Sequence, residues 1–143
     1  MSRRKSRASR SRVPLPIWIL GGFLGALVVY RFAVAPAAAQ MHPDPRSDVT
    51  AVGVVPAARY ATYPMVARTY EEARQVPQIL DGLYCHCGCK EHADHRSLLT
   101  CFETDHGVGC DVCLQEAALA YRMHQDGATL KAIREAIDAT FAD

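Results

Sequence analysis

The end of the chain carries the clearest helical pattern of apolar positions. Leu130, Ile133, Ile137 and Phe141 recur at intervals of three and four residues, which places them on one face of an α-helix. Thr129 precedes this stripe, and its hydroxyl suits the N-cap of a helix. The pattern therefore predicts a last helix that begins after Thr129 and buries Leu130, Ile133 and Ile137 in a core.

A longer helix is predicted just before it, from about Asp111 to Gln125. Gly127 follows at a position that ends helices readily, because glycine adopts the left-handed backbone conformation of a C-terminal cap. The apolar residues of this helix are Val112, Leu114, Ala117, Ala118, Tyr121 and Met123.

Shorter helical segments are predicted upstream. Thr69 can form a capping box with Glu72, so we expect a helix to begin there. Pro77 suits the first turn of a second short helix, which should stop at Gly82 or soon after it. Residues 97–102 are a further helical candidate, ended by the glycines that follow.

No run of alternating apolar and polar residues is long enough to predict a sheet. The sequence therefore predicts an all-α domain of three to five short helices over residues 69–143. A domain of this size has a marginal core, and such domains are often stabilised by disulfides, a metal or a partner. The cysteines are therefore candidates for stabilising the fold as well as for chemistry.

A long apolar segment precedes this domain. The run from Val13 to Tyr30 carries no charge, Arg31 interrupts it, and residues 32–39 are again small and apolar. Residues 13–39 fit either a signal peptide cleaved after the alanines that end the segment or an uncleaved transmembrane anchor. The anchor is favoured, because an arginine is unusual inside a signal peptide but can extend to the membrane surface from a spanning helix.

Basic residues are concentrated before this segment. The net charge is only +1, yet residues 1–12 carry six Lys or Arg and no acid, whereas all 15 acidic residues lie after residue 40. Lys and Arg beside a membrane segment stay on the cytoplasmic side. We therefore expect residues 1–12 to be a cytoplasmic tail, with the C-terminal domain periplasmic or extracellular, or secreted if the signal is cleaved. The tail is not expected to bind nucleic acid.

Residues 40–68 are predicted to be a flexible tether. Pro43, Pro45, Pro56 and Pro64 interrupt any long element, and the residues between them show no sustained periodicity. An extended, mobile segment would hold the domain away from the membrane without fixing its orientation.

Candidate chemistry begins at a cluster of alternating thiols. Cys85, Cys87 and Cys89 would point to one side of an extended chain at successive spacings of roughly 6 to 7 Å. Gly88 would let the backbone curl around a bound ion at little steric cost. Thiolates are ligands that Cu(I) and Zn(II) favour. The pattern therefore predicts a site for a soft metal ion, Cu(I) or Zn(II).

Three further cysteines follow. Cys110 and Cys113 have CxxC spacing at the predicted start of a helix, where the helix dipole lowers the pKa of a thiol. Cys101 lies between the two groups, and His92, His95 and His106 add nitrogen donors, of which His106 is the candidate ligand. The other histidines outside the cysteine motif are expected in solvent or on the surface: His42, His92, His95 and His124.

Structural disulfides are an alternative to metal binding, whereas haem attachment and several common catalytic motifs do not fit the sequence. In an exported domain, six cysteines can form three disulfides, in which Cys85, Cys87 and Cys89 would pair outwards with the other three because a CxC ring is strained. Haem attachment is excluded, because Leu114 stands where the CxxCH motif requires histidine. Nothing resembles a phosphate loop, a serine triad or a paired-carboxylate site.

Several spaced blocks in the second half of the chain resemble the bacterial CYCXC or PCYCGC-motif family, over about residues 76–141. The blocks are Leu83-Tyr84-Cys85-His86-Cys87-Gly88-Cys89, Ser97-Leu98-Leu99-Thr100-Cys101-Phe102, Asp105-His106, and Cys110-Asp111-Val112-Cys113 with Glu116 and Ala117.

The resemblance implies an exported protein of a family of unknown function. Family members are typically lipoproteins, and some are selenoproteins, which implies that at least one of these cysteine positions is a reactive group or a soft-metal ligand. His86 stands where the family motif usually has tyrosine and adds a nitrogen ligand to the expected metal site. No cysteine suited to lipidation lies near residue 40, so a transmembrane anchor is the natural substitute.

Two function classes follow, and the sequence does not decide whether the protein is an enzyme. The first is an exported, membrane-tethered metal-binding domain with Cu(I) or Zn(II) at the six cysteines, His86 and His106. The second is a thiol-disulfide oxidoreductase, in which Cys110 or Cys113 attacks a partner disulfide. A disulfide-stapled interaction module is a further alternative. The expected partners are the membrane and another exported metal or redox protein.

Overall fold

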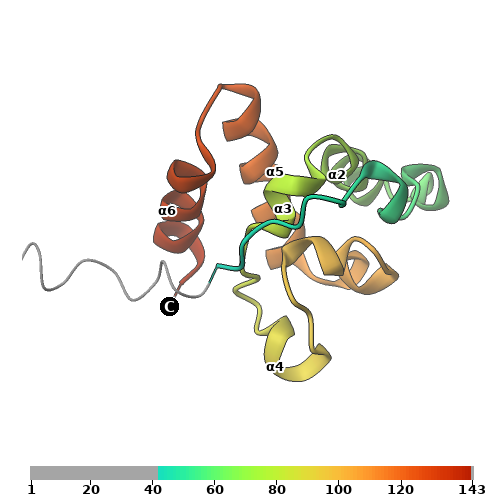
Figure 1. Cartoon of the computed structure of the whole chain (residues 1–143). Helices are drawn as coiled ribbons and strands as arrows, with labels where there is room; N and C mark the ends of the chain where they lie inside the picture. Colours follow the sequence, from blue (N-terminus) through green and yellow to red (C-terminus); the bar gives the residue numbers. More distant parts are fainter. Residues whose placement is uncertain (1–41, 143) are drawn as a thin grey trace, which may run out of the picture. The chain divides into compact units, whose positions relative to one another are not determined.

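The computed structural model describes residues 42–142, and Figure 1 shows their arrangement. Within this range the chain forms five α-helices and four short 3₁₀ helices, and it forms no strand. The prediction of an all-α fold is therefore confirmed. Among these residues no helix is both long enough and apolar enough to cross a membrane. The predicted transmembrane or signal segment, residues 13–39, lies outside the described residues.

One long helix lies at the centre of the described part. Helix α5 contacts α2, α3 and α6, whereas α4 lies below the other helices in the view of Figure 1. The elements are η2 (Ala51–Gly53), η3 (Ala57–Tyr60), α2 (Pro64–Gln75), α3 (Pro77–Asp81), α4 (Cys89–Ala93), η4 (Leu98–Cys101), η5 (Asp105–Gly109), α5 (Asp111–Gln125) and α6 (Leu130–Phe141).

The last two helices have the predicted boundaries. Gly127 adopts a left-handed backbone with φ of 83° just after α5, and the Thr129 hydroxyl accepts a hydrogen bond from the backbone N–H of Ala132 at 3.3 Å. These are the two signals from which the boundaries were predicted. Ile133 and Ile137 are buried as expected, whereas Leu130 is only half-buried.

The start of α2 differs from the prediction. The helix begins at Pro64, whose fixed φ suits a first helical position, so Thr69 lies inside the helix and does not cap it. The Thr69 hydroxyl donates to the carbonyl oxygen of Met65 at 3.1 Å, and Glu72 pairs with Arg68. The short helix α3 begins at Pro77 as predicted, and the expected helix over residues 97–102 is the 3₁₀ helix η4.

The core is centred on aromatic side chains from separate elements. The ring centroid of Tyr70 in α2 lies 4.9 Å from that of Phe102 and 4.4 Å from that of Tyr60. Other fully buried apolar residues include Ala73, Leu80, Leu83, Leu98, Leu99, Ala117, Ala120, Ile133 and Ile137. Because α2, α5, α6 and the segment around η4 all contribute, this core fixes the two segments that carry the cysteines relative to each other.

The segment over residues 42–63, here called the N-terminal strap, packs against the helices. Val54 and Tyr60 are buried, and the guanidinium of Arg74 donates to the carbonyl oxygens of Ala51 and Val54, each at 2.8 Å. Over residues 42–68, the structure therefore differs from the extended, mobile tether predicted for residues 40–68. Hydrogen bonds from side chains distant in sequence satisfy the backbone of a segment that has no periodicity of its own.

Asp81, at the end of α3, fastens the strap to the cysteine-bearing loop. Its carboxylate accepts from the backbone N–H of Arg46 at 2.7 Å, from the Arg46 side chain and from the Ser97 hydroxyl, and it pairs with Arg96 at 2.8 Å. Burial favours a higher pKa for Asp81, but the hydrogen bonds from Arg46 and Ser97 outweigh it and lower the pKa. Arg134 of α6 adds hydrogen bonds to the carbonyls of Pro43 and Gly82.

Candidate metal centre

The three alternating thiols lie on a tight turn. The backbone N–H of Gly88 donates to the carbonyl oxygen of Cys85 at 3.4 Å, and Gly88 has φ of 75°, a conformation that glycine adopts without strain. Cys89 then begins α4. The Sγ atoms are 3.3 Å apart for Cys85 and Cys87, and 3.0 Å apart for Cys87 and Cys89. The spacings of roughly 6 to 7 Å expected for an extended chain therefore do not occur, because the chain curls at Gly88, as this glycine was expected to allow.

Cys113 completes a group of four thiols. It lies in the first turn of α5, and its Sγ atom is 3.4 Å from that of Cys85 and 3.4 Å from that of Cys87. The Sγ atoms of Cys85, Cys87, Cys89 and Cys113, here called the thiol quartet, all lie within 4.8 Å of one another. The structure therefore brings together the two cysteine motifs that the sequence places far apart.

The spacing of these sulfur atoms indicates what the quartet can bind. A disulfide requires sulfur atoms about 2.05 Å apart, and all six cysteines are free thiols in the structure. Four thiolates at about 2.3 Å from a tetrahedral zinc ion would be about 3.8 Å from one another. The Sγ atoms of Cys85 and Cys89, at 3.8 Å, match this value, whereas those of Cys87 and Cys89, at 3.0 Å, would have to move apart by about 0.8 Å. Small shifts are therefore sufficient to surround an ion.

The remaining two cysteines lie at the border of the quartet. The Sγ atom of Cys101 is buried, 3.5 Å from that of Cys89 and 4.0 Å from that of Cys85. The Sγ atom of Cys110 accepts a hydrogen bond from the backbone N–H of Cys113 at 3.5 Å and caps α5. Cys101 therefore extends the donor cluster on the Cys89 side, whereas Cys110 is half-buried beside it.

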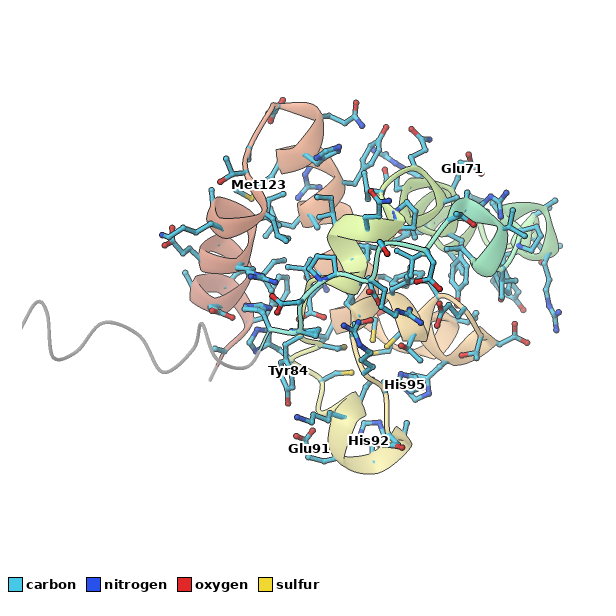
Figure 2. The ribbon with its side chains drawn as sticks, in the orientation of Figure 1. Glu71, Tyr84, Glu91, His92, His95 and Met123 are labelled. Atoms are coloured by element: carbon cyan, nitrogen blue, oxygen red, sulfur yellow. The ribbon has the colours of Figure 1, made fainter. Side chains whose placement is uncertain are left out.

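Two histidines lie against these sulfur atoms. Nε2 of His106 is 3.2 Å from Sγ of Cys89, and Nδ1 of His95 is 3.2 Å from Sγ of Cys101. Figure 2 labels His95 on the segment that leaves α4. His106 was expected near the thiols. His95 was expected in solvent, and this expectation is wrong, because the left-handed backbone of Asp94, with φ of 52°, turns the chain back towards Cys89.

His86 does not point at the thiols. Its backbone N–H donates to Oε1 of Glu116 at 2.9 Å, and its ring Nε2 lies 3.0 Å from Oδ1 of Asp138. The prediction of His86 as a ligand of the thiol site is therefore not matched by the geometry. His42, expected on the surface, is buried, and its Nε2 contacts the same Asp138 oxygen at 2.9 Å.

His42, His86 and Asp138 form a hydrogen-bonded junction and are poorly suited to hold a metal. Nδ1 of His42 accepts the backbone N–H of Tyr84 at 2.9 Å, so it carries no proton. Burial lowers the pKa of His42, which favours a neutral ring with its proton on Nε2. That nitrogen therefore donates to Asp138 and has no lone pair for a metal. The junction fastens α6 to the strap and to the Cys85–Cys89 turn.

Electrostatics within the thiol cluster favour a cation. Hydrogen bonds from Cys101 and Cys113 lower the pKa of Cys85, whereas burial raises the pKa values of Cys87 and Cys89. The cluster thus stabilises a thiolate at Cys85 and keeps protons on its neighbours. A bound cation would offset the repulsion between thiolates and release those protons, which is the usual coupling between metal binding and thiol ionisation.

Glu116 of α5 is a buried acid beside this cluster that sequence reasoning did not assign a role. Its Oε1 accepts the His86 N–H, and its Oε2 is buried without a hydrogen-bond partner among the described residues. Burial, followed by the negative charge of Cys85, raises the pKa of Glu116 to about 9. A neutral carboxyl group therefore orients the Cys85–Cys89 turn. The available signal was an acid on the same helical face as Cys113, Ala117 and Ala120.

The comparisons with known proteins agree with the cysteine pattern. The family model described as "Protein of unknown function with PCYCGC motif" matches residues 35–143. Residues 84–89, Tyr-Cys-His-Cys-Gly-Cys, have the three cysteines and the glycine of that motif, with Tyr84 and His86 at its proline and tyrosine. No curated protein and no solved structure matches the chain. Because the match covers most of the chain, the protein belongs to the PCYCGC-motif family, whose function is unknown.

Proposed function

We propose that this protein is a soft-metal-binding domain, tethered to the membrane and exposed outside the cytoplasm, that holds Cu(I) or Zn(II) through its clustered cysteines. The thiol quartet would supply the first set of ligands. Soft thiolate ligands favour both ions over hard cations, and three or four of them satisfy the preferred coordination of either.

One observation supports this proposal most strongly. Four Sγ atoms from two separate elements converge within 4.8 Å, and Cys85, Cys89 and Cys113 are almost fully buried. Thiolates at these buried positions are costly unless a cation compensates for their charge, which a bound metal ion would do. The sulfur separations of 3.3 and 3.4 Å from Cys85 to Cys87 and Cys113 are within about 0.5 Å of those around a zinc ion and well above the length of a disulfide.

A thiol-disulfide oxidoreductase is the second candidate. It is favoured by the half-buried Cys110 at the N-cap of α5, which is the more accessible thiol of the CxxC pair. Its CxxC partner Cys113, however, is fully buried, and hydrogen bonds to Cys101 and Cys85 raise the pKa of Cys113. An attacking thiol needs access and thiolate character, and Cys113 lacks both. Metal binding therefore fits the geometry better.

The membrane location is proposed from the sequence. Residues 13–39 have the length and composition of an anchor or signal, and the basic tail before them favours retention on the cytoplasmic side. Fusions of an export-dependent reporter after Gln40 test this orientation. An active reporter supports a domain outside the cytoplasm, and an inactive reporter with a stable fusion protein argues against it.

The metal is tested on the full chain, purified in detergent under anaerobic, reducing conditions. Elemental analysis and native mass spectrometry then measure which ion stays bound after desalting. The wild-type chain is expected to retain Cu(I) or Zn(II). Cys87→Ser removes a quartet ligand and is expected to weaken retention by about tenfold or more, since even supporting groups around metal sites contribute 10- to 100-fold.

Cys110→Ser is the matched control, because it removes a neighbouring thiol that lies outside the quartet. It is expected to change metal retention by less than about threefold, a small effect beside that of losing a ligand. A metal-free wild-type chain with a reducible disulfide that is lost in Cys110→Ser would instead identify an oxidoreductase. A chain with neither metal nor reducible disulfide would exclude both functions.

A further inference from the structure

The donor atoms of the cluster outnumber those that one ion needs. The thiol quartet already supplies four ligands, the number that a tetrahedral ion takes. The cluster nevertheless continues past Cys89, where Cys101 lies 3.5 Å away and His106 lies 3.2 Å away, measured from the Cys89 sulfur. The ligand atoms of Cys89, His95 and His106 also lie within 4.8 Å of one another.

The two histidines converge on this side of Cys89 from different elements. His95 follows α4, and His106 lies in η5, yet their ring centroids are 4.5 Å apart at an angle of 67°. Each ring turns a nitrogen to a sulfur atom, His106 to Cys89 and His95 to Cys101. An arrangement of two imidazoles and two thiols is a donor set typical of tetrahedral zinc, and three of these donors suffice for Cu(I).

Charge supplies a second reason to expect another cation here. Cys89 and Cys101 are fully buried, and no Lys or Arg within residues 42–142 donates a hydrogen bond to a cysteine sulfur. No Lys or Arg of this range is therefore available beside Cys101, which lies outside the quartet, to offset the charge that its sulfur would carry as a metal ligand. Uncompensated buried charge is costly, and a second cation would offset it.

We propose that the cluster binds two soft metal ions that share the Cys89 sulfur. The thiol quartet holds the first ion, and Cys89, His95 and His106, with Cys101 beside them, hold the second. The inference rests on the proposed metal-binding function and adds to it the number of ions and the second set of ligands.

The stoichiometry tests this inference directly. The full chain, reduced and free of metal, is titrated anaerobically with Zn(II) alone and, separately, with Cu(I) alone, and native mass spectrometry counts the bound ions. The wild-type chain is expected to bind two ions of at least one metal. The variant His95→Ala/His106→Ala is expected to bind only one, with its affinity for that ion changed by less than about threefold, since the quartet is intact.

His92→Ala is the matched control. His92 is exposed on α4 and stacks on His106 with ring centroids 5.7 Å apart, but its nitrogens make no hydrogen bond among the described residues to a cysteine sulfur. The His92→Ala chain should therefore still bind two ions. Circular dichroism of each apo variant, and its retention of the first ion, show whether the fold survives.

Sharing of Cys89 gives a distinct pattern among single variants. Cys87→Ser should weaken binding of the first ion only, and His106→Gln should weaken binding of the second ion only. Cys89→Ser should weaken binding of both ions. If Cys89→Ser lost only one ion, the proposal that both ions share the Cys89 sulfur would be overturned.

The two proposals fail in different ways. A wild-type chain that binds one ion with either metal, and loses it in Cys87→Ser but not in His95→Ala/His106→Ala, would overturn the second ion and leave the proposed function standing. A wild-type chain that binds neither metal would overturn both.

Discussion

Cys85 and Cys113 are 28 positions apart in the chain, yet their Sγ atoms lie 3.4 Å apart. Cys85 lies on the turn before α4, whereas Cys113 lies on α5, whose inner face is buried through Ala117 and Ala120. Packing of α5 in the core therefore sets the position of one thiol, and the Gly88 turn sets the position of the other. A metal bound by both would link a weakly packed loop to the most deeply packed helix.

This link predicts a local effect of metal removal. Cys89 is the only buried residue of α4, whereas α5 and α6 share a core that includes Ile133 and Ile137. Chelation of a metal-loaded chain should therefore remove amide-exchange protection over residues 85–95 and preserve it in the second half of α5. The free energy of unfolding should fall by about 2 to 4 kcal/mol, because a link across a long loop is lost.

Hydrogen-exchange mass spectrometry of the loaded and chelated chain measures both effects. The control is a metal-loaded chain that is exchanged in the same way into buffer without chelator. Equal loss of protection in α6 would show that the whole domain needs metal to fold. Unchanged protection over residues 85–95 would show that no metal links the loop to α5.

The junction at Asp138 predicts a variant that separates stability from metal binding. His86→Ala removes one of the two imidazole donors to Asp138 but no thiol, so it should lower the free energy of unfolding by about 1 to 3 kcal/mol. The number of bound ions should stay the same. Thermal denaturation and native mass spectrometry measure the two quantities, and loss of an ion in this variant would identify His86 as a ligand after all.

The helices near the C-terminus could be predicted because their signals are local. Thr129 and Gly127 act within a few residues of themselves, and the stripe of Ile133 and Ile137 follows the helical period. Thr69 shows the limit of such signals. A threonine before acidic residues predicts a cap, but Pro64 starts the helix earlier, and the hydroxyl of Thr69 then bonds back to Met65.

The strap and part of the site could not be predicted, because they depend on contacts between distant residues. Arg46 meets Asp81 across 35 positions, and no pattern in either segment indicates the pairing. The cysteines themselves could be identified from residue type and spacing. His95 could not, since its place beside Cys101 depends on the reversal of the chain at Asp94. His86 was expected among the ligands because it stands where the family motif usually has tyrosine, yet its ring turns to Asp138.

The buried carboxylate of Asp81 predicts a dependence of stability on pH. Asp81→Asn should lower the free energy of unfolding at pH 7 by about 2 to 3 kcal/mol, somewhat less than for a fully buried pair, because the side chains of Arg46 and Arg96 are 39% and 40% exposed. Its folded pKa lies below the ordinary value of 3.8, so the contribution is present above about pH 4 and is lost as the pH falls through the folded value.

The difference between the wild-type chain and Asp81→Asn should therefore be constant near neutral pH and shrink in acid. Urea unfolding at a series of pH values measures it. Glu135→Gln is the matched control, because Glu135 forms an exposed pair with Lys131 and should change the free energy of unfolding by less than about 0.5 kcal/mol. A difference for Asp81→Asn that grows as the pH falls would contradict the sign of its pKa shift.

Two glycines with the same backbone conformation allow the role of the cysteine turn to be tested. Gly88 has φ of 75° and Gly127 has φ of 83°, so an alanine at either position should cost about 1 to 2 kcal/mol of stability through backbone strain. Gly88 lies between two quartet cysteines, whereas a Cβ at Gly127 would meet no atom within 4 Å. Gly88→Ala should therefore weaken metal retention by about tenfold, as expected when the groups that orient ligands are disturbed, and Gly127→Ala should leave it unchanged.

Thermal melts of the apo chains and competition with a chromogenic chelator provide the two measurements. Equal stability losses with equal metal retention would show that the turn at Gly88 shapes the fold without shaping the metal site.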